Sequence, residues 1–295
     1  MRNNKQYGLE ASPLYRMRNR RKLAQLLGLS TDYFKKQHDY QYRTFPMTKK
    51  SGGERYVSDP EPSLKRMQKR LCNLLSRIST PDWVKSGKKH SSYINNADFH
   101  RNSHYVRTMD IASFYDSVQR KYVYDLFRNR FKMEGDIAAI ITHMVLDSDG
   151  KLPTGSPTSQ AVAYWSYKAM FDEIHDIAER YGCEFTLYVD DMTFSAQHPI
   201  SDKMRYEVAC LLKAWGLKAK ARKDHYYRNG DVKYITGICI KDGKMLVPNR
   251  NRKRILDQYR KCGNEPSDDN FRKLQGMLNS ARQIEAGLFS SIRLC

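Results

Sequence analysis

The feature that most constrains the fold of this chain is a pair of adjacent carboxylates set between two β-like runs. The sequence Tyr-Val-Asp-Asp at residues 188–191 follows the β-branched and aromatic run Phe185–Val189, and a second such run begins at Thr193. This pattern predicts a strand, a tight turn that carries Asp190 and Asp191, and a returning strand. Because Asp is favoured in ordinary turns, the doublet alone is also typical of a plain hairpin.

A third carboxylate in a matching setting favours a metal site over a plain turn. Asp110 lies at the end of another β-like run, residues 105–111. In nucleotidyl transfer, two divalent cations roughly 3.5–4 Å apart activate a 3′-oxygen and neutralise the pyrophosphate leaving group. Mg²⁺ demands octahedral oxygen ligands, which short Asp side chains at strand ends can present. We therefore expect Asp110, Asp190 and Asp191 to bind two Mg²⁺ ions, for which Mn²⁺ can substitute.

The chain is strongly basic, with 52 Lys and Arg against 32 Asp and Glu and a formal net charge of +20. Such a charge favours a polyanionic partner or an anionic membrane surface. No apolar run approaches the roughly 20 residues of a membrane-spanning helix. The N-terminal sequence MRNNKQYGLE also lacks the apolar core of a signal peptide. We therefore expect a cytoplasmic nucleic-acid-binding protein without a membrane partner, with its cysteines reduced.

A hairpin is predicted over residues 42–58, where two short β-like runs flank a Gly-Gly turn. Lys49, Lys50 and Arg55 lie beside this turn. Long cationic side chains at the tip of a hairpin can bind phosphates, although the same charges also suit a solubilising turn.

Hydrophobic spacing predicts helices for much of the remaining chain. They are expected at residues 13–37, 63–78, 119–151, from 156 or 158 to 174, 201–215, 247–261 and 269–286. Residues 216–227 and 234–240 are strand-like. The loop LPTGSPTS (152–159) precedes a predicted helix start, where free N–H groups suit a phosphate or a template backbone, or simply an ordinary cap.

His100 and His104 are four residues apart, a spacing found in some zinc sites. No Glu follows the first His and no Cys is near. Because a third and a fourth ligand are missing, zinc is disfavoured.

Several of these pieces occur in an order that resembles the reverse transcriptases. The strand with Asp110, the LPTGSPTS loop, the YVDD sequence, the basic stretch GLKAKARKD (216–224) and ITG (235–237) follow the order of that family's palm motifs. The resemblance runs from about residue 42 to 240. NNADFH (95–100) and ITG narrow it to the bacterial retron reverse transcriptases, which carry an NAxxH element and a VTG-type motif. Residues 12–29 are also similar to the N-terminal segment of that group.

The resemblance implies an α+β right-hand polymerase fold. Residues 1–104 would form N-terminal helices and fingers, and residues 105–240 a palm with an antiparallel sheet and fingers helices inserted at about 119–151. Residues 241–295 would form a short helical thumb. Since the chain then stops, we expect no RNase H domain of ordinary size and removal of the template by a host RNase H.

The resemblance also assigns roles to single residues. Asp110, Asp190 and Asp191 would bind the metal ions, with the backbone carbonyl of Ile111 as a further ligand. The nucleotide site would comprise Lys49 or Lys50 and Arg55 at the triphosphate, Tyr115 as a steric gate beneath the sugar, Gly155 for close approach, and Lys223 as the general acid for pyrophosphate.

The sequence also departs from the family pattern in the nucleotide pocket. The departures are Thr154 for the usual Gln, Gln160 where Pro often follows, Tyr115 for the Phe of retron enzymes, Val189 for their commoner Ala, and Lys220 for Asn. They bear on the dNTP pocket and on fidelity, and none removes a metal ligand.

Retron enzymes copy their own structured noncoding RNA, which is both template and primer, and they start from the 2′-hydroxyl of a guanosine. The RNA-linked single-stranded DNA product implies dNTP substrates, and many such systems act against phages with an accessory effector protein. The alternatives are another bacterial reverse transcriptase, of the intron type or template-independent, and a non-catalytic RNA-binding scaffold. Clustered unpaired carboxylates bring only repulsion unless a metal is present, which argues against the scaffold.

Overall fold

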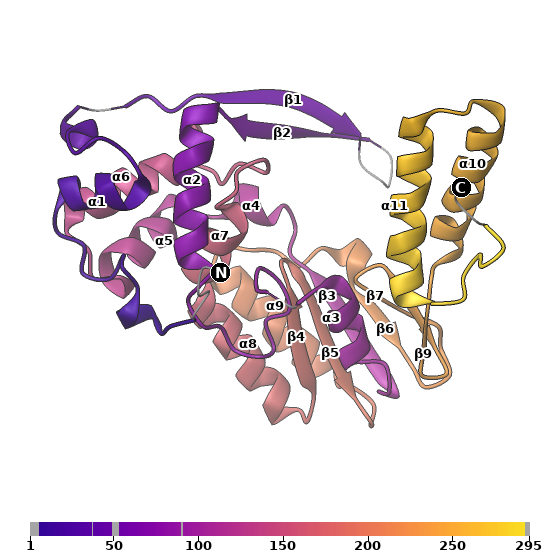
Figure 1. The fold of residues 1–295 in the computed structure, drawn as a ribbon. Coiled ribbons are helices and arrows are strands. Elements are labelled where there is room, and N and C mark those ends of the chain that lie inside the picture. Colours follow the sequence, from indigo (N-terminus) through magenta and orange to yellow (C-terminus); the bar gives the residue numbers. More distant parts are fainter. Residues whose placement is uncertain (1–5, 37, 49–52, 90, 293–295) are drawn as a thin grey trace.

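The computed structural model describes residues 6–36, 38–48, 53–89 and 91–292. Its centre is a four-stranded antiparallel sheet in the order β4-β5-β3-β6 (Figure 1). The strands span Glu184–Tyr188 (β4), Asp191–Ala196 (β5), Tyr105–Asp110 (β3) and His225–Tyr227 (β6). The sheet therefore joins segments that lie far apart in the sequence. Together with the helices around it, this sheet confirms the predicted α+β class.

The two faces of this sheet differ in chemistry because side chains alternate along each strand. On one face the pairs Leu187–Met192 and Phe185–Phe194 are buried in the main hydrophobic core. The helices α8 (Lys168–Arg180) and α9 (Asp202–Ala214) contribute Ile174 and Met204, among other side chains, to the same core. The other face carries hydroxyl side chains, including the cross-strand pair Thr108–Thr193, and leads to the paired Asp110 and Asp191.

A long hairpin projects from the N-terminal half of the molecule. It consists of β1 (Tyr42–Thr48) and β2 (Glu54–Pro60), and in Figure 1 it extends above the sheet towards the C-terminal helices. The two predicted strands are confirmed, and α2 (Pro62–Leu75) follows as the sequence indicates. Other helices on this side of the molecule include α1 (Arg20–Leu27), α5 (Arg120–Asp125), α6 (Gly135–Val145) and α7 (Ser159–Ser166).

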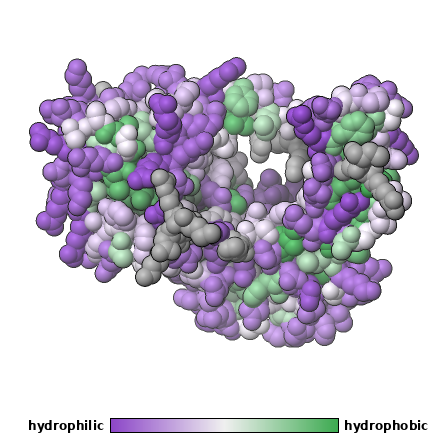
Figure 2. Space-filling model, viewed as in Figure 1, coloured by the Kyte–Doolittle hydropathy of each residue, from purple (hydrophilic) through white to green (hydrophobic). Residues whose placement is uncertain are grey.

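The C-terminal part is an antiparallel pair of helices with a core of its own. α10 (Asn249–Asn264) and α11 (Asp268–Ile284) pack through Ile255, Leu274 and Leu278, which confirms the two predicted helices. A small sheet of β7 (Lys233–Ile235), β8 (Ile238–Lys241) and β9 (Lys244–Leu246) precedes them. Figure 2 shows a hollow between this helix pair and the N-terminal half of the molecule.

Several predicted elements are shorter or broken in the structure. The expected strand 234–240 is a hairpin, because Thr236 and Gly237 both adopt left-handed backbone angles and turn the chain. The strand-like stretch 216–227 forms a strand only at β6, after a short 3₁₀ turn. Over 119–151 the helices α5 and α6 are separated by the π-helical turn Leu126–Arg130.

The predicted helix over residues 13–37 is confined mainly to α1. Gly28 ends α1 in a left-handed conformation, so the chain leaves the helix before Ser30. The next residues form only a 3₁₀ turn at Tyr33–Lys35. The helix predicted up to residue 174 is interrupted at Tyr167, where α7 ends and α8 begins. Within the described residues, no helix combines the length and the apolar character needed to cross a membrane.

Candidate active site

Three carboxylates from two distant parts of the chain meet at one end of the sheet. Asp110 is the last residue of β3, Asp191 is the first of β5, and the two are paired directly opposite each other. Asp190 lies in the turn between β4 and β5. Carboxylate oxygens of the three residues lie within 4.8 Å of one another. The structure therefore brings together the residues that the sequence predicts as metal ligands.

The turn itself is displaced by one residue from the prediction. Tyr188 pairs with Asp191, so the two central residues of the turn are Val189 and Asp190, and Asp191 already belongs to β5. We call residues 188–191 the Asp turn. Val189 has a φ of 62°, which gives the primed type of turn that matches the twist of a hairpin. This offset places Asp191 on the same face of the sheet as Asp110.

The carboxylates repel each other in a partly dry site. Burial raises the pKa of Asp190, and the neighbouring Asp110 adds to this effect. Burial likewise raises the pKa of Asp191 to about 7; the charge of Lys223 opposes this increase, and Asp190 and Asp110 add to it. Like charges directly opposite each other in a sheet are destabilising. A bound cation would remove this repulsion, and a cluster of hard oxygen donors suits Mg²⁺.

The ammonium group of Lys223 faces this cluster. Its Nζ donates a hydrogen bond to Asp110 Oδ2 and lies 3.5 Å from Asp191 Oδ1. Burial opposes the charged form of Lys223, yet these carboxylates raise its pKa overall. The predicted general acid is therefore adjacent to the predicted metal ligands.

Two backbone hydrogen bonds connect the segment just before Lys223 to the end of β3 and the residues that follow it. The N–H of Lys220 donates to Asp110 O at 2.7 Å, and the N–H of Ala112 donates to Lys218 O at 2.8 Å. Asp224 points away from the cluster and forms an ion pair with Arg107 of β3 at 3.1 Å. Sequence reasoning missed this pair, because its two residues lie 117 positions apart.

Ile111 and Tyr115 also lie beside the carboxylates. Ile111 is 1% exposed, and its N–H donates to Asp190 O at 3.3 Å. The role of its carbonyl as a ligand stays a prediction. Tyr115 lies half-buried on α4 (Phe114–Ser117). Burial, and next the charge of Asp190, raise the pKa of Tyr115.

Gly155 and Thr154 attach their loop to the long hairpin. A Cβ at Gly155 would lie 2.7 Å from Ser58 O, so only glycine fits against β2 here. Thr154 Oγ1 donates to Tyr56 O at 3.2 Å. The close approach seen in the structure is thus to β2, and an approach to a nucleotide remains a prediction.

The remaining predicted nucleotide ligands belong to the hairpin. Arg55 is part of β2, where its backbone pairs with Met47. Lys49 and Lys50 lie outside the described residues. Their proposed contact with a triphosphate stays a prediction.

The NNADFH element forms a buried polar connection around His100. His100 is 0% exposed, and its Nδ1 and Nε2 each lie 2.7 Å from a hydroxyl, of Ser195 and Thr186 respectively. Thr186 also donates to Asn96 Oδ1 at 2.7 Å. Asn96 in turn lies 3.5 Å from Thr236 of the ITG sequence, so the two motifs touch. His104 is exposed and does not share these contacts.

Comparisons with known proteins all lead to reverse transcriptases. The family model "Reverse transcriptase (RNA-dependent DNA polymerase)" matches residues 47–239. The retron Se72 reverse transcriptase of Salmonella heidelberg (strain 579083-10) is 24% identical, with 79% of this chain and 64% of that protein covered. The retron Ec86 reverse transcriptase of Escherichia coli is 26% identical, with 74% and 68% covered. The chain thus spans about two thirds of the length of these curated relatives.

Among solved structures, the foamy viral protease-reverse transcriptase in complex with double-stranded DNA is similar, with a TM-score of 0.49 and 15% identity. The match covers 86% of this chain and 40% of that one. The family model alone matches well over half of the sequence and includes all three carboxylates. The chain therefore belongs to the reverse transcriptase family, the RNA-dependent DNA polymerases.

Proposed function

We propose that this protein is the RNA-directed DNA polymerase of a retron. The observation that carries the proposal is the meeting of Asp110, Asp190 and Asp191 on the open face of a sheet, next to Lys223. Relatives that are named retron reverse transcriptases support the narrower assignment. So does the contact between Asn96 and Thr236, which joins the two sequence elements that resemble retron motifs.

The residues of the site have separate roles in nucleotidyl transfer. Asp110, Asp190 and Asp191 would hold two Mg²⁺ ions, with the Ile111 carbonyl as a further ligand. When bound, these ions activate the primer hydroxyl and neutralise the charge of the leaving pyrophosphate. Lys223, whose Nζ lies beside the same carboxylates, supplies a proton to that leaving group.

Other residues of this chain select and orient the incoming dNTP. Tyr115 lies beneath the sugar and rejects a 2′-hydroxyl by steric contact. Arg55, with Lys49 or Lys50, binds the triphosphate from the long hairpin, and Gly155 lies beside the nucleotide. In this assignment the hairpin and N-terminal helices are the fingers, the four-stranded sheet is the palm, and α10 with α11 is the thumb.

The proposed template and primer is a structured noncoding RNA. It occupies the hollow between the N-terminal half and the C-terminal helix pair (Figure 2). Synthesis starts from a guanosine 2′-hydroxyl in the cytoplasm and gives RNA-linked single-stranded DNA. A host RNase H removes the template, and an accessory effector protein completes an anti-phage system. The basic chain, with a formal net charge of +20, suits the RNA partner.

Asp190→Asn provides the direct test. The protein and its variant are purified from cells that carry the native locus, and the bound nucleic acids are sequenced before and after RNase treatment. We expect the wild type to extend an RNA primer with dNTPs and to carry RNA-linked DNA. The variant should bind the same RNA with similar affinity but form no DNA. Primer extension by the variant would contradict the assignment.

The nucleic acids recovered also separate the alternatives. DNA without a covalent RNA link would indicate an intron-type or template-independent enzyme. RNA without any DNA, bound equally by the wild type and the variant, would indicate a non-catalytic scaffold.

A further inference from the structure

Val189 occupies a costly backbone conformation within the Asp turn. Its φ of 62° lies in the left-handed region, which a β-branched residue rarely adopts. Such a conformation persists only where the surrounding structure imposes it. The contacts that hold Val189 therefore also determine where the next residue, Asp190, presents its carboxylate.

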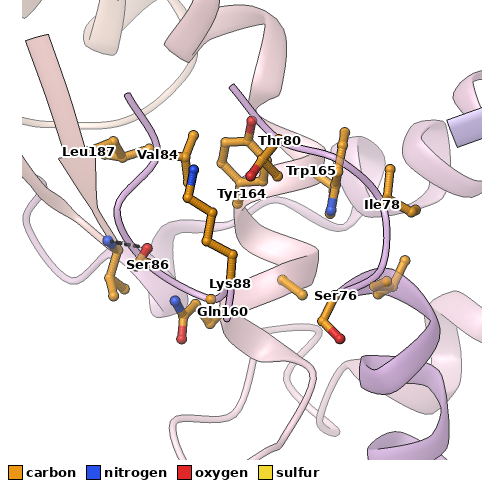
Figure 3. A pocket seen from close by; sticks show the side chains of 14 residues that line it. Ser76, Ile78, Thr80, Val84, Ser86, Lys88, Gln160, Tyr164, Trp165 and Leu187 are labelled. Atoms are coloured by element: carbon orange, nitrogen blue, oxygen red, sulfur yellow. Dashed lines mark hydrogen bonds between the residues drawn. The ribbon is translucent and has the colours of Figure 1, made fainter. Parts of the chain in front are cut away.

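The principal contacts come from a short segment after α2. Residues 83–86, which we call the edge segment, run beside β4: Leu187 N–H donates to Trp83 O at 2.9 Å, and Lys85 N–H donates to Leu187 O at 2.8 Å. Beyond this pairing, the N–H of Val189 donates to Ser86 Oγ at 2.9 Å. Figure 3 shows Ser86 and this bond, with Leu187 nearby.

A second contact holds the turn from the opposite side. The carbonyl of Asp190 accepts a hydrogen bond from Ile111 N–H at 3.3 Å, directly after Asp110. The peptide groups around Asp190 are therefore fixed between the edge segment and the end of β3. Each of these two bonds reaches the turn from outside the β4–β5 hairpin, whose own pairing ends at Tyr188 and Asp191.

The packing beside Val189 is incomplete. A cavity of about 40 Å³ adjoins Val189, Leu187 and Ser86, and Figure 3 shows Gln160 and Tyr164 on its wall. Within the described residues, the buried Tyr164 Oη and Thr80 Oγ1 that line this cavity have no hydrogen-bond partner. Because side-chain packing beside Val189 is incomplete, the hydrogen bond that Val189 N–H donates to Ser86 Oγ contributes much of the constraint on the turn.

We propose that Ser86 is a positioning residue for the carboxylate of Asp190. Its hydroxyl accepts the Val189 N–H and holds the left-handed conformation, so that Asp190 lies within reach of Asp110 and Asp191. This inference rests on the proposed function, because it concerns the geometry of the same metal-binding cluster.

The test combines Ser86→Ala, Ser86→Thr, Val189→Gly and the double variant Ser86→Ala/Val189→Gly. We expect Ser86→Ala to lower kcat for primer extension by roughly tenfold to a hundredfold, as small displacements of reacting groups do, with KM for dNTP unchanged. Its affinity for Mn²⁺, measured by electron paramagnetic resonance without nucleic acid or dNTP, should fall with kcat. Ser86→Thr keeps the acceptor oxygen and should retain most of both.

The glycine background tests the cause of the loss. Glycine adopts left-handed angles without strain, so Ser86→Ala should cost much less in Val189→Gly than in the wild type. An equal loss in both backgrounds would overturn the proposal, and so would a Ser86→Ala protein with wild-type kcat and Mn²⁺ affinity. If Asp190→Asn still extends primers, the proposed function fails, whereas the Mn²⁺ measurement still decides the role of Ser86.

Discussion

At the scale of single residues, the site is built from charges that the fold holds in unfavourable proximity. Asp110 is 3% exposed and faces Asp191 directly, although like charges opposite each other destabilise a sheet. Lys223 offsets part of this repulsion. Because the pKa of Asp191 is raised from 3.8 to about 7 in the folded protein, its ionisation costs stability as the pH rises between these two values. Cation binding would restore this stability.

The ion pair between Arg107 and Asp224, the residue that follows Lys223, gives a prediction at this scale. Arg107 forms ion pairs with two carboxylates. The side chain of Asp224 is 9% exposed, whereas that of Asp202 is 88% exposed. Asp224→Asn should lower the free energy of unfolding by about 3 kcal/mol, because it leaves the buried Arg107 charge poorly compensated. It should also lower kcat, because Asp224 follows Lys223. Urea unfolding and primer extension measure both effects.

Asp202→Asn is the matched control for this pair. It removes a carboxylate from the same guanidinium, but in an exposed position, so it should cost less than about 1 kcal/mol. Equal losses in the two variants would show that burial of the pair is not the cause.

At the scale of elements, the polar connection around His100 joins α3 (Tyr93–Phe99) to β4 and β5. Burial lowers the pKa of His100 to about 3, and the charge of Lys85 adds to this. The folded pKa lies below the unfolded value of 6.5, so the contribution of neutral His100 is present above pH 6.5. It is lost progressively as the pH falls towards 3.

The prediction is that His100→Asn flattens the pH dependence of stability. Between pH 6.5 and 3 the wild type should lose a few kcal/mol more than the variant, because only the wild type must take up this proton on unfolding. Urea unfolding at a series of pH values gives the difference. His104→Asn, at an exposed position, should follow the wild-type curve. Parallel curves for the wild type and His100→Asn would contradict the prediction.

At the scale of elements, one can also see which helices, hairpins and contacts were predictable from the sequence. Periodicity located the helices α2, α9, α10 and α11 and the hairpins at β1–β2 and β4–β5, because each has a local pattern. The turn at Thr236 was missed, since a left-handed Thr has no signal in composition. Ser86 and Val189 lie 103 residues apart, so their bond depends on tertiary structure alone. The carboxylates could be predicted because metal chemistry restricts the residue type at strand ends.

At the scale of the whole molecule, the hollow lies between the N-terminal half and the C-terminal helix pair (Figure 2). In Figure 1, α11 is the helix of that pair nearer to the hairpin and the N-terminal half, and α10 lies on its far side. If RNA occupies the hollow, cations on α11 contact its phosphates more than those on α10. Phosphate contacts by cations make affinity fall with salt concentration.

Two matched charge reversals test this arrangement. Arg272 lies two positions before Leu274, whose side chain is buried in the core between the helices, so the helical period directs it away from α10. Lys253 lies likewise two positions before the buried Ile255, and so points away from α11. We expect Arg272→Glu to weaken binding of the RNA several-fold and to reduce the salt slope by about one. Lys253→Glu should change neither quantity much, because its helix face lies away from the hollow. Filter binding at several salt concentrations measures both, and a larger effect of Lys253→Glu would place the RNA on the outer side of the helix pair.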